Sequence, residues 1–208
     1  GCPYECIFCA SHETMGRGYR QRSIENVLEE IRYLKKEFDV NGLYFNDDIF
    51  GIKRQWAIDF CEALKKEPYK IKWGIQTRAN LVNREFLEAL KSAGCIQVDI
   101  GCESGSDEIL GNLKKGITQA QILNAFQLCR EVGLETYTTF IIGNPGETLE
   151  HIKETERIAK TINSRVMFLT LVPYPGSELF DMAKEGDWLI DKNLHYAENW
   201  TNKQSEDP

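Results

Sequence analysis

Short runs of β-branched and aromatic residues alternate along the chain with longer segments in which apolar residues recur at helical spacing. Each short run is bounded by polar residues, glycine or proline, as strands usually are, and the runs lie at 43–46, 70–75, 96–101, 135–142 and 166–172. The longer segments between them are expected to be helices, which gives five β/α units. This alternation predicts an α/β fold with a parallel sheet.

Several of the expected helices carry sequence signals for their first residues. The segment 23–38 has an apolar stripe, glutamates early and lysines late, and Ser23 is its expected N-cap. Asn83 is expected to cap a second helix. Thr118 and Gln121 have the spacing of a capping box at the start of a third.

The start of the chain lacks one strand of the expected alternation. The helix at 23–38 follows a cysteine-rich segment directly, yet no strand candidate precedes that segment. Because a parallel strand needs neighbours to satisfy its backbone groups, we expect a first strand upstream of Gly1. We expect one domain at 1–195, followed by a polar tail or linker at 196–208 that has no hydrophobic period.

Composition narrows the class of protein. The 208 residues are 42% hydrophobic, which is enough for one packed core. A net charge of -7 disfavours a nucleic-acid partner. No apolar run reaches the roughly 20 residues that span a bilayer, and no signal segment opens the chain. The sequence therefore predicts a soluble, cytoplasmic protein.

Cysteine spacing points to a metal centre near the start of the chain. Cys2, Cys6 and Cys9 have the spacing C-x3-C-x2-C, and a 4Fe-4S cluster held by three cysteines keeps one iron open to a substrate or cofactor. A zinc-stabilised binding module would instead use His12 as the fourth ligand. A simple electron-transfer protein would need a fourth protein ligand, for which Cys102 at a strand end is a candidate. The remaining cysteines are expected to be buried and free.

The segment 1–9, G-C-P-Y-E-C-I-F-C, resembles the signature loop of the radical S-adenosylmethionine (radical SAM) superfamily, including the aromatic Phe8 before the third cysteine. Further segments resemble the subgroup that often carries an upstream cobalamin-binding domain, namely 20–23, 44–50, 101–105, 143–148 and 173–176. The resemblance implies a partial (β/α)6 TIM-like barrel whose first strand would precede Gly1. It also implies a 4Fe-4S cluster on Cys2, Cys6 and Cys9.

The resemblance further implies an activity. A reduced cluster would cleave S-adenosylmethionine into methionine and a 5′-deoxyadenosyl radical, which abstracts hydrogen from a small-molecule substrate. A one-electron donor such as ferredoxin or flavodoxin would reduce the cluster. Cobalamin on an upstream domain would make methyl transfer or cyclisation the expected reaction.

Polar residues at the carboxyl ends of the expected strands are candidates for the active site, because parallel β/α barrels place it there. Asn46, Asp47 and Asp48 occupy the position where the family often has Gly-Gly-Glu, and the resemblance implies that they hold the cofactor's amino group. The alternative is that they cap a helix that starts near Lys53.

Two later strand ends carry further candidates. Gln76 and Arg78 follow the third strand of the implied barrel, where a guanidinium could bind the cofactor carboxylate or a substrate acid. By resemblance, Glu103 accepts hydrogen bonds from the ribose hydroxyls, with Ser104 beside it. For Glu103, the alternative is a surface salt bridge, with Lys115 as a possible partner.

The remaining expected contacts are aromatic residues and turns. By resemblance, Tyr4 and Phe8 contact the cofactors, and Gly143 and Pro173 lie at strand ends near the adenine. Glycine permits close backbone approach there. The alternative is that the segment 143–147 is only a strand-to-helix connection.

Overall fold

The computed structural model describes residues 1–186 and 188, so the predicted tail at 196–208 and the end of the predicted domain lie outside the described residues. The helices are α1 Ser11–Met15, α2 Ile24–Phe38, α3 Arg54–Leu64, η1 Ala79–Leu81, α4 Arg84–Ser92, α5 Asp107–Asn112, α6 Gln119–Val132, α7 Leu149–Ile162 and α8 Glu178–Glu185. The strands are β1 Gly42–Phe45, β2 Lys72–Thr77, β3 Cys95–Ile100, β4 Glu135–Ile142 and β5 Arg165–Thr170. None of the helices described is both long and apolar enough to cross a membrane.

The five strands form one sheet in the order β1-β2-β3-β4-β5, and all pairs are parallel. Each strand therefore lies beside its neighbour in the sequence, which is the order of a β/α barrel rather than of a doubly wound sheet. The α/β fold and the partial barrel expected from the sequence are confirmed. The predicted strands are shifted by at most two residues at either end.

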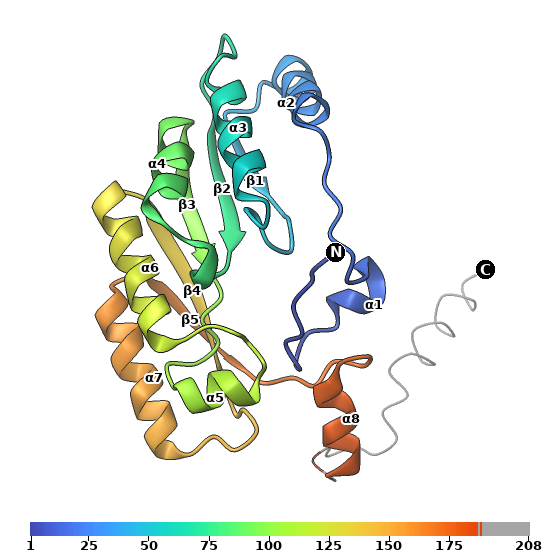
Figure 1. The fold of residues 1–208 in the computed structure, drawn as a ribbon, viewed down its shortest axis with the longest axis vertical. Helices are drawn as coiled ribbons and strands as arrows, with labels where there is room; N and C mark the ends of the chain where they lie inside the picture. The colour runs from blue at the N-terminus through green and yellow to red at the C-terminus, as the bar shows by residue number, and fades with distance from the viewer. Residues whose placement is uncertain (187, 189–208) are drawn as a thin grey trace, which may run out of the picture.

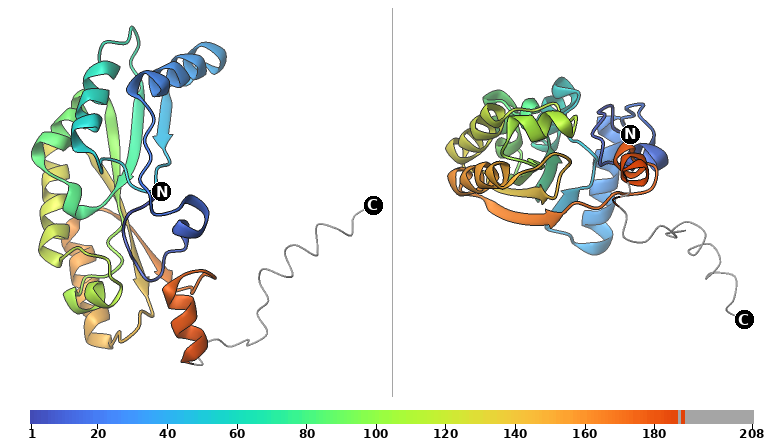
Figure 2. Two further views of the ribbon diagram at one scale, coloured as in Figure 1. Left: turned by 45° about the vertical axis from the view of Figure 1, so that its right-hand side comes forward. Right: turned by 90° about the horizontal axis from the view of Figure 1, so that it is seen from below.

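The helices α4, α6 and α7 and the cysteine-rich segment lie on different sides of this sheet. Figures 1 and 2 show α4, α6 and α7 along one side, while the first residues, α1 and α8 lie on the other side. The first residues run past the arrowheads of the strands (Figure 1). Segments far apart in the sequence thus meet at the carboxyl ends of the strands.

The predicted helix caps are confirmed. The Ser23 side chain accepts a hydrogen bond from the backbone N–H of Asn26 at 3.2 Å. The Asn83 side chain accepts one from the N–H of Phe86 at 2.9 Å. Thr118 and its partner Gln121 form the full capping box. These local signals place the helices because they satisfy backbone donors that the first turn leaves free.

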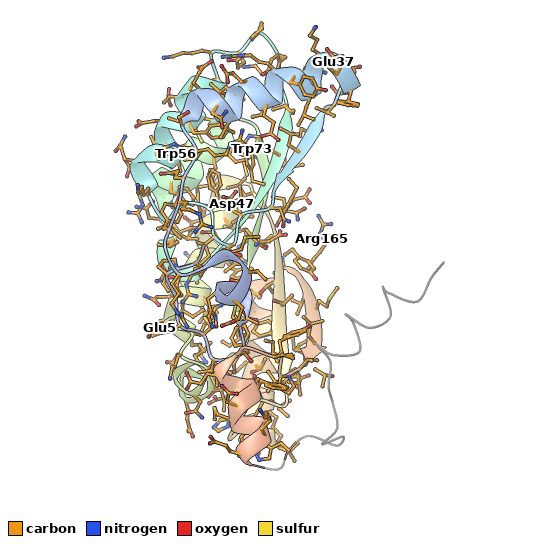
Figure 3. The ribbon with its side chains drawn as sticks, turned by 90° about the vertical axis from the view of Figure 1, so that its right-hand side faces the viewer. Glu5, Glu37, Asp47, Trp56, Trp73 and Arg165 are labelled. Atoms are coloured by element: carbon orange, nitrogen blue, oxygen red, sulfur yellow. The ribbon has the colours of Figure 1, made fainter. Side chains whose placement is uncertain are left out.

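Aromatic residues fill the space between the first strands and the helices that cover them. Trp56 and Phe60 of α3 stack with ring centroids 5.5 Å apart, and Phe45 of β1 meets Trp73 of β2 edge to face at 5.4 Å. The buried indole N–H of Trp73 donates to the Ala93 carbonyl at 2.9 Å. Figure 3 shows Trp56 and Trp73 close together in the upper part of the molecule. This packing holds β1 and β2 against α3.

Candidate active site

The cysteine loop is anchored at its centre by Ile7. This side chain is 2% exposed and packs in a small apolar cluster with Ile109, Leu113 and Leu179. The Ile7 N–H donates to the Leu113 carbonyl at 3.1 Å, and the Ile7 carbonyl accepts from the Leu179 N–H at 2.9 Å. The loop is therefore fixed between α5 and α8 through a residue that carries none of the chemistry.

The three loop cysteines face one cavity of about 340 Å³ at the carboxyl ends of the strands. All three are half-buried free thiols. From the loop, Phe8 and Ser11 also line the cavity. The rest of the lining comes from the strand ends and the loops after them, namely Asp48, Ile49, Gln76, Thr77, Arg78, Asp99, Ile100, Gly101, Glu103, Lys115, Tyr137, Thr138 and Thr139.

The arrangement of these thiols suits a multi-iron cluster better than a single ion. Across residues 1–186 and 188, no three His, Cys, Asp or Glu side chains are close enough together to hold one metal ion. A structural zinc needs four such ligands in a closed tetrahedron, and the proposed fourth ligand, His12, lies instead 3.2 Å from a Glu13 carboxylate oxygen. Three thiols that line one cavity of about 340 Å³ suit a cluster of several irons, which is wider than one ion.

The other four cysteines are not available as ligands. Cys61, Cys95, Cys102 and Cys129 are all buried in the main core, and burial raises the pKa of each thiol to about 12. Metal ligation requires the thiolate. Cys102, the candidate fourth ligand of an electron-transfer centre, does not line the cavity.

The acidic turn after β1 is divided between two hollows. Asp48 lines the cysteine cavity, whereas Asn46 and Asp47 line a second hollow of about 420 Å³ beside Tyr19. Figure 3 shows Asp47 below the two tryptophans, toward the middle of the molecule. The pKa of Asp47 is raised by burial and by the charge of Asp48.

This turn is held in place by β2 and does not cap a helix. The Gln76 side-chain amide donates to the Asp47 carbonyl. The alternative in which the acids cap the next helix is wrong, because the N-cap of α3 is Lys53. Asp48 is therefore free to face the cavity.

Arg78 lies at the cavity wall but directs its donors to the chain itself. Its guanidinium stacks on the Tyr4 ring, 3.7 Å from the ring centroid, and donates to the Lys115 carbonyl. A further donor, Nη1, lies 3.5 Å from the Cys6 sulfur. Tyr4 itself does not line the cavity.

Glu103 and Lys115 form a buried ion pair in the cavity wall. The Lys115 Nζ lies 2.6 Å from Glu103 Oε1, and the two side chains are only 8% and 9% exposed. The alternative of a surface salt bridge is therefore wrong for Glu103. The backbone of Glu103 also has a φ of 64°, a left-handed conformation that residues other than glycine rarely adopt. Such conformations persist where the surrounding structure enforces them, often at functional sites.

Besides Tyr4, Asn46 and Asp47, three further expected contacts lie outside the cavity, namely Ser104, Gly143 and Pro173. Ser104 is fully buried, and its hydroxyl lies 3.3 Å from that of Thr155 on α7. The Gly143 N–H donates to the Glu147 carboxylate, which closes the turn after β4 on itself. The Ser104 contact thus joins the loop after β3 to α7, whereas the Gly143 contact stays within its own turn.

Part of the cavity floor was not expected from the sequence. Asp99 of β3 and Tyr137 of β4 are register partners and both line the cavity. Asp99 accepts hydrogen bonds from the Tyr44 hydroxyl and the Gln97 amide, each at 2.7 Å. The signal was the polar residue at every second position of β3, which marks an inner face that is not packed with apolar side chains.

Comparisons with known proteins show the family of the chain. The family model described as the radical SAM superfamily matches residues 1–159. An uncharacterized methyltransferase of Pyrococcus horikoshii, PH0819, is 35% identical over the whole chain, which covers 44% of that protein. The anaerobic magnesium-protoporphyrin IX monomethyl ester cyclase of Rubrivivax gelatinosus is 34% identical over 86% of the chain and 33% of its own length.

Solved structures share the fold. The radical S-adenosylmethionine methyltransferase TsrM of Kitasatospora setae, with cobalamin and a [4Fe-4S] cluster bound, superposes with a TM-score of 0.83 at 22% identity. That superposition covers 93% of this chain and 37% of TsrM. The cobalamin-dependent enzyme OxsB, with aqua-cobalamin and S-adenosylmethionine bound, superposes with a TM-score of 0.78 at 24% identity, over 90% of this chain and 34% of OxsB. The chain spans less than half the length of these relatives.

Proposed function

The chain belongs to the radical SAM superfamily, and from this we propose that it binds a 4Fe-4S cluster and S-adenosylmethionine in the cysteine cavity to start radical chemistry on a small molecule. The observation that carries the proposal is that the thiols of Cys2, Cys6 and Cys9 share one cavity with the polar carboxyl ends of β1, β2 and β3. When bound, the cluster supplies the electron that cleaves S-adenosylmethionine to methionine and a 5′-deoxyadenosyl radical.

The chain's own residues have distinct roles in this proposal. Cys2, Cys6 and Cys9 are the cluster ligands. The Asp48 carboxylate faces the cavity and suits the ammonium group of the methionine moiety, and Glu103 suits the ribose hydroxyls. The apolar anchor at Ile7 keeps the thiols in register with these acids, because it fixes the loop against α5 and α8. The protein thus positions the cofactor and limits access of water.

The relatives' names support methyl transfer or cyclisation as the reaction class, and the solved TsrM and OxsB structures, which hold cobalamin, support its use as a cofactor. We propose one of these as the activity to which the radical chemistry contributes, in the cytoplasm, with ferredoxin or flavodoxin as the one-electron donor.

Anaerobic reconstitution with iron and sulfide tests the proposal. We expect a brown protein with about four irons per chain, because three thiolates hold one cluster. On addition of dithionite and S-adenosylmethionine, it should release 5′-deoxyadenosine and methionine, measured by chromatography. A colourless protein that retains stoichiometric zinc would contradict the proposal. So would an iron–sulfur protein that never binds S-adenosylmethionine.

A variant of Glu103 tests its proposed contact with the ribose. Glu103→Gln keeps the shape but weakens a charge-assisted hydrogen bond worth about 1.5–3 kcal/mol. Affinity for S-adenosylmethionine should therefore fall by about tenfold or more. The change in the cluster's electron paramagnetic resonance signal during an anaerobic titration measures that affinity.

The matched control separates this contact from the ion pair. Lys115→Met also breaks the pair, but it keeps the Glu103 carboxylate in the cavity wall. We expect it to bind S-adenosylmethionine more tightly than Glu103→Gln does. An unaltered binding curve for Glu103→Gln, at normal cluster content, would remove Glu103 from the cofactor site.

A further inference from the structure

Arg78 is a buried cation without an acidic partner. The residue is 3% exposed, and no carboxylate of the described residues forms a salt bridge with it. The one buried carboxylate nearby in the cavity wall, Glu103, is paired with Lys115. A buried charge is costly unless other groups compensate it. The contacts of the Arg78 guanidinium therefore show what stabilises its charge.

Those contacts come from Tyr4 and Cys6 of the cysteine loop, from the Lys115 carbonyl and from Asn80 on η1. The guanidinium lies over the Tyr4 ring at 3.7 Å and donates to the Lys115 carbonyl. Its Nε lies 3.4 Å from Asn80 Oδ1, and its Nη1 lies 3.5 Å from the Cys6 sulfur. The only one of these partners that can carry a full negative charge is the Cys6 thiolate.

Arg78 also holds the loop from a different side than Ile7 does. Ile7 is fixed by α5 and α8, whereas Arg78 follows β2 and contacts Tyr4 and Cys6, which both precede Ile7 in the loop. The loop is thus held by the apolar packing of Ile7 and by the Arg78 guanidinium that stacks on Tyr4. The planar guanidinium of arginine suits this position, since a lysine ammonium cannot stack flat on an aromatic ring while its donors point along the plane of that ring.

From these contacts we propose that Arg78 is the counter-ion and positioning residue of the cysteine loop, donating to the sulfur of Cys6 in the cluster-loaded protein. This inference rests on the proposed function, because the cluster supplies the negative charge. Hydrogen bonds to the sulfurs and nearby positive charge raise the reduction potential of an iron–sulfur cluster. Arg78 thereby favours the reduced form and keeps Cys6 in place before the cluster is bound.

Two measurements test this role without an activity assay. In Arg78→Gln, the cluster's midpoint potential in the absence of S-adenosylmethionine, followed by electron paramagnetic resonance, should fall below that of the unaltered protein. In the apo protein, backbone hydrogen exchange at residues 4–9 should accelerate by at least about tenfold, because a charged hydrogen bond contributes that factor to an opening equilibrium. Arg78→Lys retains the charge, so its midpoint potential should lie between those of Arg78→Gln and the unaltered protein. Backbone hydrogen exchange in its cysteine loop should still be faster than in the unaltered protein.

Arg54→Gln is the matched control. Arg54 is exposed and donates to the Leu81 carbonyl, so its loss removes an arginine contact near the same segment without touching the loop. It should change neither measurement. If Arg78→Gln keeps both the potential and the loop exchange and only loses affinity for S-adenosylmethionine, Arg78 binds the cofactor carboxylate and the inference is overturned. If Arg78→Gln does not fold, an unchanged potential and loop exchange in Arg78→Lys overturn it equally. Failure of the unaltered protein to load iron would instead contradict the proposed function.

Discussion

Replacing Cys6 with alanine is expected to abolish stable cluster binding and, with it, all cleavage of S-adenosylmethionine. The described residues provide no nearby substitute, because the other four cysteines are buried thiols whose pKa burial raises to about 12. Two remaining thiolates cannot hold a cluster that three are proposed to ligate. Iron and sulfide content after anaerobic reconstitution measures the loss, and release of 5′-deoxyadenosine measures its consequence.

Cys129→Ala is the control for this change. Cys129 is fully buried on α6 and does not line the cavity, so its loss affects packing but removes no ligand. This variant should load about four irons, as the unaltered protein does. Normal iron content in Cys6→Ala would show that the cluster lies elsewhere or uses other ligands. Zinc in place of iron in the unaltered protein, lost in Cys6→Ala, would support the zinc-binding module instead.

Replacing Lys115 with methionine is expected to cost about 3–5 kcal/mol of unfolding free energy, because it leaves a buried carboxylate without its partner. Glu103 and Lys115 are among the most buried charged residues described, and their charged atoms lie 2.6 Å apart. The Lys115 backbone carbonyl, which accepts from Arg78, remains in the variant. Urea denaturation of the apo protein measures the change.

The adjacent lysine provides the control. Lys114 pairs with Glu178 at 2.7 Å, but both side chains are about half exposed, at 52% and 50%. Lys114→Met should therefore change the unfolding free energy by at most about 1 kcal/mol. The double variant Glu103→Gln/Lys115→Met should be more stable than Lys115→Met alone, because no unpaired charge remains. Equal losses for the two lysine variants would mean that water screens the Glu103–Lys115 pair.

The fold was largely predictable from the sequence because its signals are local. Hydrophobic periodicity placed all five described strands within two residues, and the caps at Ser23, Asn83 and Thr118 depend on atoms three residues away. The proposed ligands Cys2, Cys6 and Cys9 were recognisable for the same reason, since their spacing lies within one short loop. Their role in binding the cluster stays a prediction until iron binding is measured.

The cavity was less predictable, because its contacts join residues far apart in the sequence. Asp48, Gln76, Arg78 and Glu103 were expected at strand ends, and the structure brings all of them to the cavity. It turns Ser104 toward α7 and leaves Gly143 and Pro173 outside, although these also lie near strand ends. A strand end determines which edge of the sheet a residue occupies, but the loop after it determines where the side chain points.

The sequence by itself therefore determined the order of strands and helices, the cysteine spacing and the family resemblance, all of which depend on neighbouring residues. Only the tertiary structure decided that Arg78 faces Cys6, 72 residues away, and that the Glu103–Lys115 pair is buried rather than exposed. Burial and charge pairing result from packing between distant segments. The amino-acid sequence shows which charged groups are present, whereas the free energy of each charge depends on the groups that surround it in the folded protein.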